Sequence, residues 1–296
     1  MILRFFAAVG LVLLTASWGL AGEQAKLVML GDSVTLSADA PEGKKLRDCT
    51  EKALNALSKG RPVWTVVNKG VGGETSEGGL GRIAGVLAAE KPDFLSIAYG
   101  LNDARHHSGD WFKGKYTALV DAAGKAQPPP RLVLVTATPF LNDKHAWGKE
   151  PFFVKAGGLD RFLDRDLNGV TRTLAAERGL PLCDIHRQFL AEPKYAQFIK
   201  GDGVHLVPEG NEFAGARIAA CVQAVWLAGV ARDAAALDAE TKARAKAAAA
   251  RKALEAAGGQ PTAEAVTALG EAAALCPYLA ETAVLLDKVA AAQERK

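Results

Sequence analysis

A serine, an aspartate and a histidine occur in this sequence in contexts that would let them perform acyl transfer together. Ser33 follows Gly31 at the end of a short apolar run, and Asp202 precedes His205 by three residues near the other end of the chain. A serine hydroxyl becomes a good nucleophile only when a neighbouring base takes its proton, and a histidine can do so near neutral pH. A carboxylate on the other ring nitrogen orients that histidine. We therefore predict Ser33 as nucleophile, His205 as general base and Asp202 as its partner.

The same chemistry requires hydrogen-bond donors for the oxyanion that forms when an acyl group is attacked. Three candidates follow apolar runs in the sequence: the backbone N–H of Ser33, the backbone N–H of Gly73 and the side-chain amide of Asn102. Each such donor is worth about 3 kcal/mol of transition-state stabilisation. We predict these three groups as the oxyanion hole.

Each candidate residue also has an interpretation that involves no chemistry. Asp32 or Ser33 would cap a helix, Gly73 would form a turn, and Asn102 would bond its own backbone. Asp202 would cap a turn, and His205 would be a structural histidine. The joint occurrence of all these residues favours the catalytic interpretation.

Elements that would bring these residues together follow from the apolar pattern. Apolar runs alternate with helical patterns, and they lie at 26–31, 63–67, 94–98, 131–136 and 180–185. The runs are continuous, which is typical of parallel strands buried on both faces. Right-handed crossovers then place helices on both faces of a parallel sheet, with the polar loops at one edge. We predict helices over 44–58, 111–123, 159–174 and 208–227, and an irregular stretch over 137–158.

The two ends of the chain differ in composition from this α/β region. Residues 1–21 have a basic residue, an apolar segment and small residues before a cleavage site, which predicts a signal peptide and export to the periplasm or medium. A retained membrane anchor is the alternative. Residues 22–230 form the predicted main domain, without stable membrane insertion after cleavage. Residues 231–296 are rich in Ala, Lys and Glu and predict a helical extension that packs on the domain or projects from it.

The net charge, the cysteines and the histidines indicate which partners, disulfides and metals to expect. The 296 residues carry a net charge of +3 without a basic run, so we expect no nucleic-acid partner. Of the four cysteines, Cys49 and Cys221 lie on apolar helical faces. They either form a disulfide between the first and last helices of the domain or are free buried thiols. The adjacent His106 and His107 form no compelling ligand pattern, so we expect no metal.

Four short blocks carry a resemblance to a known family. They are Gly31-Asp32-Ser33, the glycine-rich stretch 68–75 with Gly73, Gly100-Leu101-Asn102-Asp103, and Asp202-Gly203-Val204-His205. In this order they resemble the blocks of the SGNH, or GDSL-type, esterases and lipases, from Lys26 to about Val230. The resemblance implies a three-layer α/β/α, flavodoxin-like fold, a five-stranded parallel sheet of order 2-1-3-4-5, and hydrolysis without metal or cofactor. The block spacing is most similar to the thioesterase/lysophospholipase and carbohydrate-esterase branches.

These observations lead to a serine esterase that acts on short acyl groups, such as acetyl, on a small-molecule or glycan substrate. Aromatic residues available to stack on sugar rings are Trp111, Trp147, Phe152 and Phe153, for which ordinary packing is the alternative. Two other functions stay open. One is a lysophospholipase or thioesterase using the same residues, and the other is a catalytically silent glycan-binding module of the cell envelope.

Overall fold

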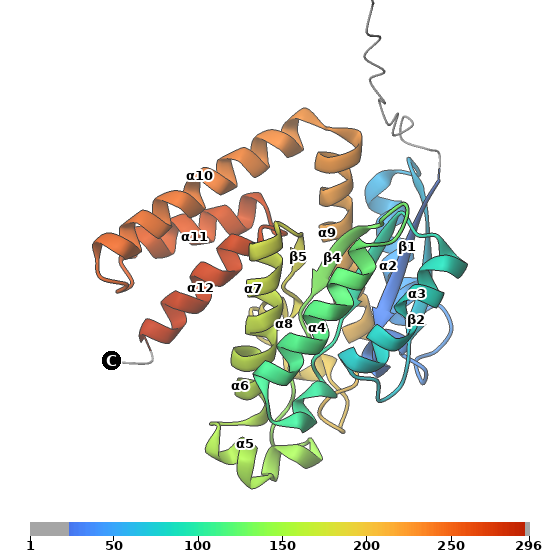
Figure 1. Ribbon diagram of the computed structural model, residues 1–296, viewed down its shortest axis with the longest axis horizontal. Helices are drawn as coiled ribbons and strands as arrows, with labels where there is room; N and C mark the ends of the chain where they lie inside the picture. The colour runs from blue at the N-terminus through green and yellow to red at the C-terminus, as the bar shows by residue number, and fades with distance from the viewer. Residues whose placement is uncertain (1–23, 294–296) are drawn as a thin grey trace, which may run out of the picture.

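A five-stranded parallel sheet lies at the centre of the protein, as a computed structural model describes it for residues 24–293 (Figure 1). The predicted signal peptide lies outside the described residues. The strands are β1 (Gln24–Gly31), β2 (Val63–Gly70), β3 (Phe94–Ala98), β4 (Arg131–Val135) and β5 (Leu182–Cys183). Their order in the sheet is β2-β1-β3-β4-β5, and each neighbouring pair is parallel. This confirms the predicted α/β class and strand order.

Continuous apolar sequence makes the inner strands the centre of the core. Leu27 and Leu30 of β1 and Leu95 of β3 are all fully buried, because helices cover both faces of the sheet. The last strand is shorter than the predicted 180–185. The chain leaves the sheet at Asp184, whose backbone carbonyl accepts the first hydrogen bond of helix α8 (Ile185–Leu190) from Gln188.

Two groups of helices cover the sheet. Helices α2 (Leu46–Ser58) and α9 (Pro208–Trp226) pack against each other on one face, and α3 (Ser76–Glu90), α4 (Gly109–Gly124) and α7 (Gly169–Arg178) lie on the other (Figure 1). The segment Pro208–Ala231 is apolar and long enough to cross a membrane, but 56% of its most apolar window is buried inside the protein. A core helix of a folded domain has the same features.

Short elements fill the connections between strands and helices. They are α1 (Ser33–Leu36), η1 (Asp103–His106), η2 (Ala146–Lys149), α5 (Pro151–Lys155), α6 (Leu159–Phe162), η3 (Leu163–Asn168), η4 (Tyr195–Phe198) and η5 (Leu227–Ala231). The stretch predicted as irregular therefore contains two short helical segments, η2 and α5. The helix predicted over 159–174 is interrupted, because a π-helical segment, η3, separates α6 from α7.

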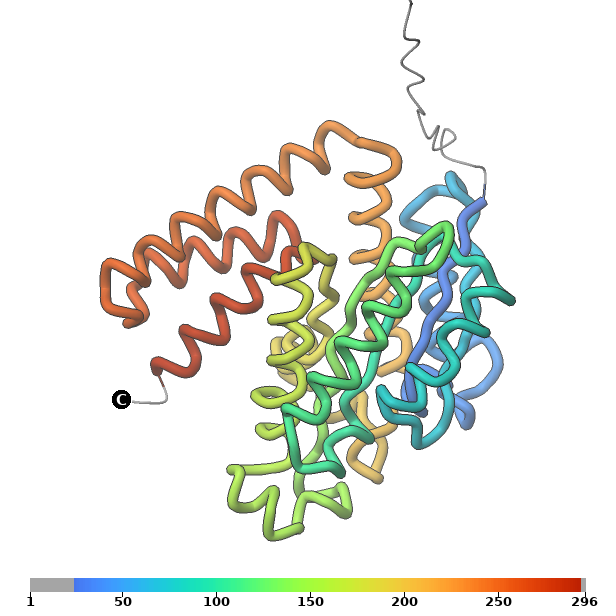
Figure 2. The backbone as a smooth tube through the Cα atoms, in the orientation of Figure 1, coloured from blue at the N-terminus to red at the C-terminus, as the bar shows by residue number. Residues whose placement is uncertain are grey.

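The alanine-rich extension forms three helices that stand beside the sheet domain (Figures 1 and 2). They are α10 (Ala234–Ala256), α11 (Ala263–Leu275) and α12 (Ala280–Gln293). Small side chains at helical spacing, Ala243, Ala247 and Ala250, are buried where α10 packs against α11. Helix α12 packs against α7, so the extension docks on the domain. The division into 22–230 and 231–296 stays a prediction.

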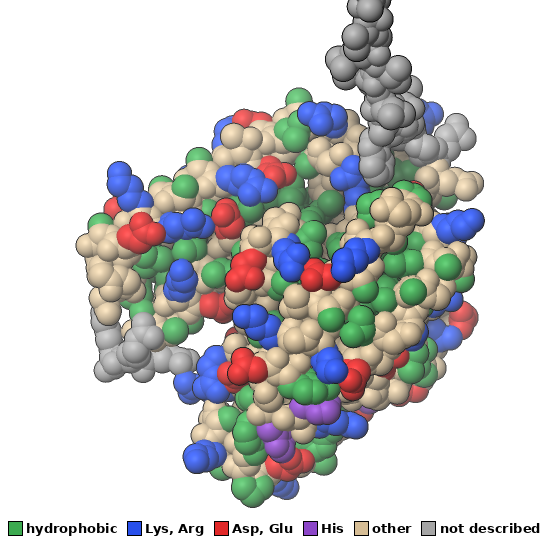
Figure 3. Space-filling view, viewed as in Figure 1, with side chains coloured by type: hydrophobic (Ala, Val, Ile, Leu, Met, Phe, Trp, Pro, Cys, Tyr) green, Lys and Arg blue, Asp and Glu red, His purple; other side chains and the backbone are tan. Residues whose placement is uncertain are grey.

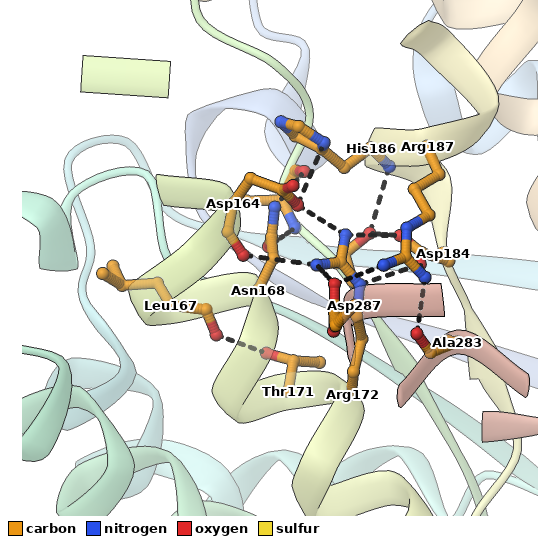
Figure 4. A network of polar contacts seen from close by, with 12 residues as sticks. Asp164, Leu167, Asn168, Thr171, Arg172, Asp184, His186, Arg187, Ala283 and Asp287 are labelled. Carbon is orange, nitrogen blue, oxygen red and sulfur yellow. Dashed lines mark hydrogen bonds and ion pairs between the residues drawn. The ribbon is translucent and has the colours of Figure 1, made fainter. Parts of the chain in front are cut away.

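An ionic cluster around a buried arginine joins α12 to the domain (Figure 4). The fully buried guanidinium of Arg172, on α7, donates to Asp184 over 2.8 Å and to Asp287 of α12 over 3.2 Å, and it also pairs with Asp164. Arg187 of α8 pairs with Asp287 and donates to the carbonyl of Ala283 over 2.7 Å. We refer to Asp164, Arg172, Asp184, Arg187 and Asp287 as the Arg172 cluster.

The disulfide alternative for Cys49 and Cys221 is wrong, and all four cysteines are free, buried thiols. The helices that carry them, α2 and α9, are neighbours as expected. Cys49, however, faces Gly215, where an added Cβ would lie 2.8 Å from the Cβ of Cys49. Cys221 lies six positions further along α9, roughly 9 Å along its axis. Its thiol instead neighbours that of Cys183, and this neighbour together with burial raises the pKa of Cys221.

Candidate active site

Ser33 stands at a sharp turn between β1 and the short helix α1. An added Cβ at Gly31 would lie 2.2 Å from Thr35 Oγ1 and 2.7 Å from the carbonyl oxygen of Ala98, so only glycine fits there. The carboxylate of Asp32 accepts a hydrogen bond of 2.9 Å from the backbone N–H of Val34 and caps α1. The capping interpretation therefore holds for Asp32, while the hydroxyl of Ser33 is left for another partner.

That partner is His205, and the three predicted catalytic side chains form one chain of hydrogen bonds. His205 Nε2 lies 2.9 Å from Ser33 Oγ, and His205 Nδ1 lies 2.8 Å from Asp202 Oδ2. Ser33 comes from the end of β1 and the other two come from the loop before α9, 172 positions away for His205. The geometry is that of a nucleophile, its base and the carboxylate that orients the base.

The loop that carries Asp202 and His205 is shaped by the aspartate itself. Asp202 Oδ1 accepts hydrogen bonds of 3.0 Å from the backbone N–H groups of Val204 and His205. Burial acts to raise the pKa of Asp202, but these two bonds and the His205 ring lower it below its usual value. Asp202 is therefore ionised at neutral pH, as an orienting carboxylate must be.

The stretch after β4 packs on this loop and explains the glycine between Asp202 and His205. Gly203 has a φ of +79°, and an added Cβ would lie 2.6 Å from the backbone nitrogen of His145. The carbonyl of Gly203 accepts a hydrogen bond of 2.9 Å from the backbone N–H of Leu141. A side chain at position 203 would displace this contact and with it the His205 ring.

The predicted oxyanion donors meet at the same edge of the sheet. The loop with Gly73 is tied to the end of β1 by a hydrogen bond of 3.0 Å from the backbone N–H of Val71 to the carbonyl of Gly31. Gly73 has a φ of +72°, which a glycine adopts readily. The Asn102 amide donates over 3.1 Å to the carbonyl of Glu74, the residue after Gly73. Ser33, Gly73 and Asn102 thus lie on three connected loops, and their role as donors stays a prediction.

Comparison with known proteins agrees with this geometry. The sequence model of the GDSL-like Lipase/Acylhydrolase family matches residues 29–213. The chain belongs to this family. Its members are ester hydrolases by name, and the matched range contains every residue of the candidate site.

One relative is similar in sequence, and two solved structures are similar in fold. An arylesterase from Vibrio mimicus is 36% identical over 78 residues, which cover 26% of this chain and 38% of that relative. A lipase/acylhydrolase from Enterococcus faecalis has a TM-score of 0.55 at 23% identity, covering 67% of this chain and 95% of that one. A catalytic mutant of an acetylxylan esterase from Geobacillus stearothermophilus has a TM-score of 0.53 at 21% identity, covering 69% and 95%.

Asp103 holds this GDSL-like site together in a way the sequence did not reveal. Its buried carboxylate accepts from the N–H and the hydroxyl of Ser76, at 2.9 and 2.5 Å, and from the N–H of Gly100 at 3.1 Å. It therefore joins the start of α3 to the loop that carries Asn102. Burial raises the pKa of Asp103, although these hydrogen bonds oppose the shift. The only signal in the sequence is its position next to Asn102.

The aromatic residues considered for sugar stacking differ in their surroundings. Phe153 is fully buried, so packing is the correct interpretation there. Trp111 stacks on His106, with ring centroids 3.5 Å apart, and Phe152 stacks on His107 at 4.1 Å. Arg105 lies over the ring of the half-buried Trp147, 5.5 Å from its centroid.

The histidine and acidic side chains of residues 24–293 bear on the prediction that the protein needs no metal. The two adjacent histidines at 106 and 107 face different rings, and residues 24–293 contain no group of three or more His, Cys, Asp or Glu able to hold a metal ion. The face of the molecule in Figure 3 mixes basic and acidic side chains, and histidines reach its surface at the end that carries α5. The absence of a metal and of a nucleic-acid partner stays a prediction.

Proposed function

We propose that this protein is an exported serine esterase that removes short acyl groups, acetyl above all, from carbohydrate. Ser33 attacks the ester carbonyl while His205 takes its proton, and His205 then donates that proton to the leaving alcohol. Water, activated by His205, hydrolyses the acyl-enzyme. Ser33, Gly73 and Asn102 bind the oxyanion in both steps. The observation that carries the proposal is the hydrogen-bonded chain from Ser33 through His205 to Asp202.

The structural relatives and the expected export support an acetyl group on a sugar as the substrate. Acetylxylan esterases are among the proteins of similar fold, and an exported enzyme would meet glycan esters.

A substrate panel tests the proposal. We expect the purified protein to hydrolyse p-nitrophenyl acetate and acetylated xylo-oligosaccharides faster than p-nitrophenyl octanoate, lysophosphatidylcholine or palmitoyl-CoA. Faster release of long acyl chains would indicate a lysophospholipase or thioesterase. No hydrolysis of any ester, together with retained binding to glycan, would indicate the silent module. N-terminal sequencing of protein recovered outside the cytoplasm tests export, with a mature start near Gly22 as the expected result.

A further inference from the structure

Glu74 is joined to both loop-borne oxyanion donors, Gly73 and Asn102. It directly follows Gly73 in the chain, and its backbone N–H donates to the carbonyl of Val71 over 3.2 Å to close the turn around that glycine. Its own carbonyl accepts the Asn102 amide over 3.1 Å. A small displacement of Glu74 would therefore move both donors together.

The side chain of Glu74 is held from two sides. Arg82 of α3 donates from Nε to Glu74 Oε1 over 2.7 Å and from Nη2 to Oε2, a two-point pairing that restricts rotation of the carboxylate. The hydroxyl of Tyr99, which follows β3, donates to Oε2 over 2.6 Å. The carboxylate of Glu74 is 10% exposed and the guanidinium side chain of Arg82 is 24% exposed, so solvent weakens this pairing little.

Arg82 also connects this loop to the strands next to Ser33. Its Nη2 donates to the carbonyl of Lys69, near the end of β2, over 2.6 Å. The same nitrogen lies 3.4 Å from the carbonyl oxygen of Gly31, two residues before Ser33. One guanidinium thus links the nucleophile strand, its neighbour in the sheet and the loop with Gly73.

The room for this arrangement depends on a glycine. An added Cβ at Gly79, on α3, would lie 2.6 Å from the hydroxyl oxygen of Tyr99. A side chain there would push Tyr99 away from Glu74.

The Tyr99 hydroxyl keeps its proton. Burial and the Glu74 hydrogen bond raise the pKa of Tyr99 far above its usual value, so its hydroxyl stays a donor. No pattern in the sequence predicts a role for Glu74, Arg82 or Tyr99.

We propose that Glu74 and Arg82 are positioning residues for the oxyanion hole, and that Tyr99 supports them. Arg82 has a second task in this proposal. An unpaired carboxylate on the residue after Gly73 would repel the developing oxyanion, and the guanidinium reduces that repulsion. Loss of Arg82 should therefore slow the reaction more than loss of Glu74, although both break the same pair. The inference rests on the proposed function of Ser33, Gly73 and Asn102.

Steady-state kinetics on four variants tests this. We expect Glu74→Gln to lower kcat for p-nitrophenyl acetate about tenfold to a hundredfold, with KM within about twofold, since displaced donors act only on the transition state. Arg82→Gln should lose more, and Tyr99→Phe less. Glu77→Gln is the matched control, because Glu77 lies on the same helix and pairs with Lys115 at the surface.

A boronic acid inhibitor separates positioning from simple stabilisation of the fold. Its tetrahedral adduct on Ser33 would place an oxygen in the oxyanion hole, so its affinity should fall by the same factor as kcat in each folded variant. A loss of thermal stability with unchanged kcat and boronate affinity would overturn the inference, as would a larger loss for Glu74→Gln than for Arg82→Gln. If Glu74→Gln does not fold, Tyr99→Phe decides, because it removes a single hydroxyl.

The outcome for the wild-type protein distinguishes two failures. If it hydrolyses esters and loses that activity in Ser33→Ala, but Glu74→Gln and Arg82→Gln match Glu77→Gln, this inference alone is wrong. If the wild-type protein hydrolyses no ester, the proposed function and the inference both fall.

Discussion

Arg82 and Arg172 each lie at the centre of a group of charged and polar partners, but the two groups connect different parts of the molecule. Arg82 has one carboxylate, Glu74, and otherwise donates to a phenol and to backbone carbonyls near Ser33. Arg172 is fully buried and pairs with three carboxylates, Asp164, Asp184 and Asp287. The first group touches the loops of the candidate active site, whereas the second joins the domain to α12.

The difference suggests a division of tasks that follows from position and burial. A two-point pair next to a loop fixes the position of that loop, so its loss should act mainly on the geometry of the site. The guanidinium of Arg172 is shielded from solvent, and the carboxylate of Asp184 is largely so. These two charges must stay paired, because either would be costly to bury alone. We therefore expect changes at the catalytic edge to alter turnover, and changes in the Arg172 cluster to alter the free energy of unfolding.

Removal of the nucleophile gives the largest expected effect. Ser33→Ala should lower kcat by about a million-fold, since loss of the serine disables the whole catalytic unit, while the free energy of unfolding stays close to that of the wild type. Hydrolysis of p-nitrophenyl acetate and urea denaturation measure the two quantities. Ser37→Ala is the control. Ser37 follows the last residue of α1, and its hydroxyl donates over 2.7 Å to the backbone carbonyl of Val34. Near-wild-type activity of pure Ser33→Ala would remove Ser33 from its role.

In the Arg172 cluster, Arg172→Met should lower stability and leave turnover unchanged, the reverse of Ser33→Ala. It would leave the buried carboxylate of Asp184 without its main partner and lower the free energy of unfolding by about 3–5 kcal/mol, while kcat of the folded enzyme stays unchanged. Urea denaturation measures this loss. Arg178→Met, which breaks an exposed pair with Asp121, should cost about 0–1 kcal/mol. A fall in kcat with unchanged stability would reverse the proposed division.

Asn102→Ala tests the catalytic edge more gently. We expect kcat to fall about a hundredfold, with KM nearly unchanged, because the oxyanion exists only on the reaction path. Asn55→Ala is the matched control, because the side-chain amide of Asn55 also hydrogen-bonds to the backbone, at Trp64, but lies away from the site. A rise in KM alone would make Asn102 a residue that binds the ground-state substrate.

The smallest expected effect is on the pH dependence of the free energy of unfolding, to which the buried Asp32 and Asp184 contribute with opposite sign. Burial, with the nearby charges of Asp103 and Glu74, raises the pKa of Asp32 to about 7. Although burial acts to raise the pKa of Asp184, Arg172 holds it below its usual value. Between about pH 4 and 7 the folded protein keeps a proton on Asp32 that the unfolded chain has released, so this residue makes stability fall as pH rises. Asp184 contributes stability above about pH 4 that is lost at lower pH.

Asp32→Asn should remove the first of these dependences. The stability of this variant relative to the wild type should be greater at pH 8 than at pH 5. Urea denaturation at both pH values measures the two free energies of unfolding. Asp238→Asn, on an exposed part of α10, should show no such difference. Parallel curves for wild type and Asp32→Asn would mean that Asp32 is already ionised at pH 5.

Much of the fold and of the candidate site follows from local sequence. Continuous apolar runs predicted buried parallel strands, because neither face of such a strand meets solvent and so neither needs polar residues. The residue types of Ser33, Asn102, Asp202 and His205 are those the chemistry needs, and their places at strand ends bring them to one edge of the sheet. These features depend on short-range pattern and on the handedness of crossovers, so they can be predicted without coordinates.

Tertiary structure alone decided which distant side chains meet. Arg172 pairs with Asp287, which lies 115 positions away in a helix whose own pattern predicts no contact. Cys49 faces Gly215 and not Cys221, since the offset between α2 and α9 is set by how closely the two backbones approach. Arg82 reaches Glu74 and the strand ends beside Ser33 only because α3 packs on that side of the sheet. Local pattern determines elements, whereas the partners of a buried charge depend on the packing of the elements around it.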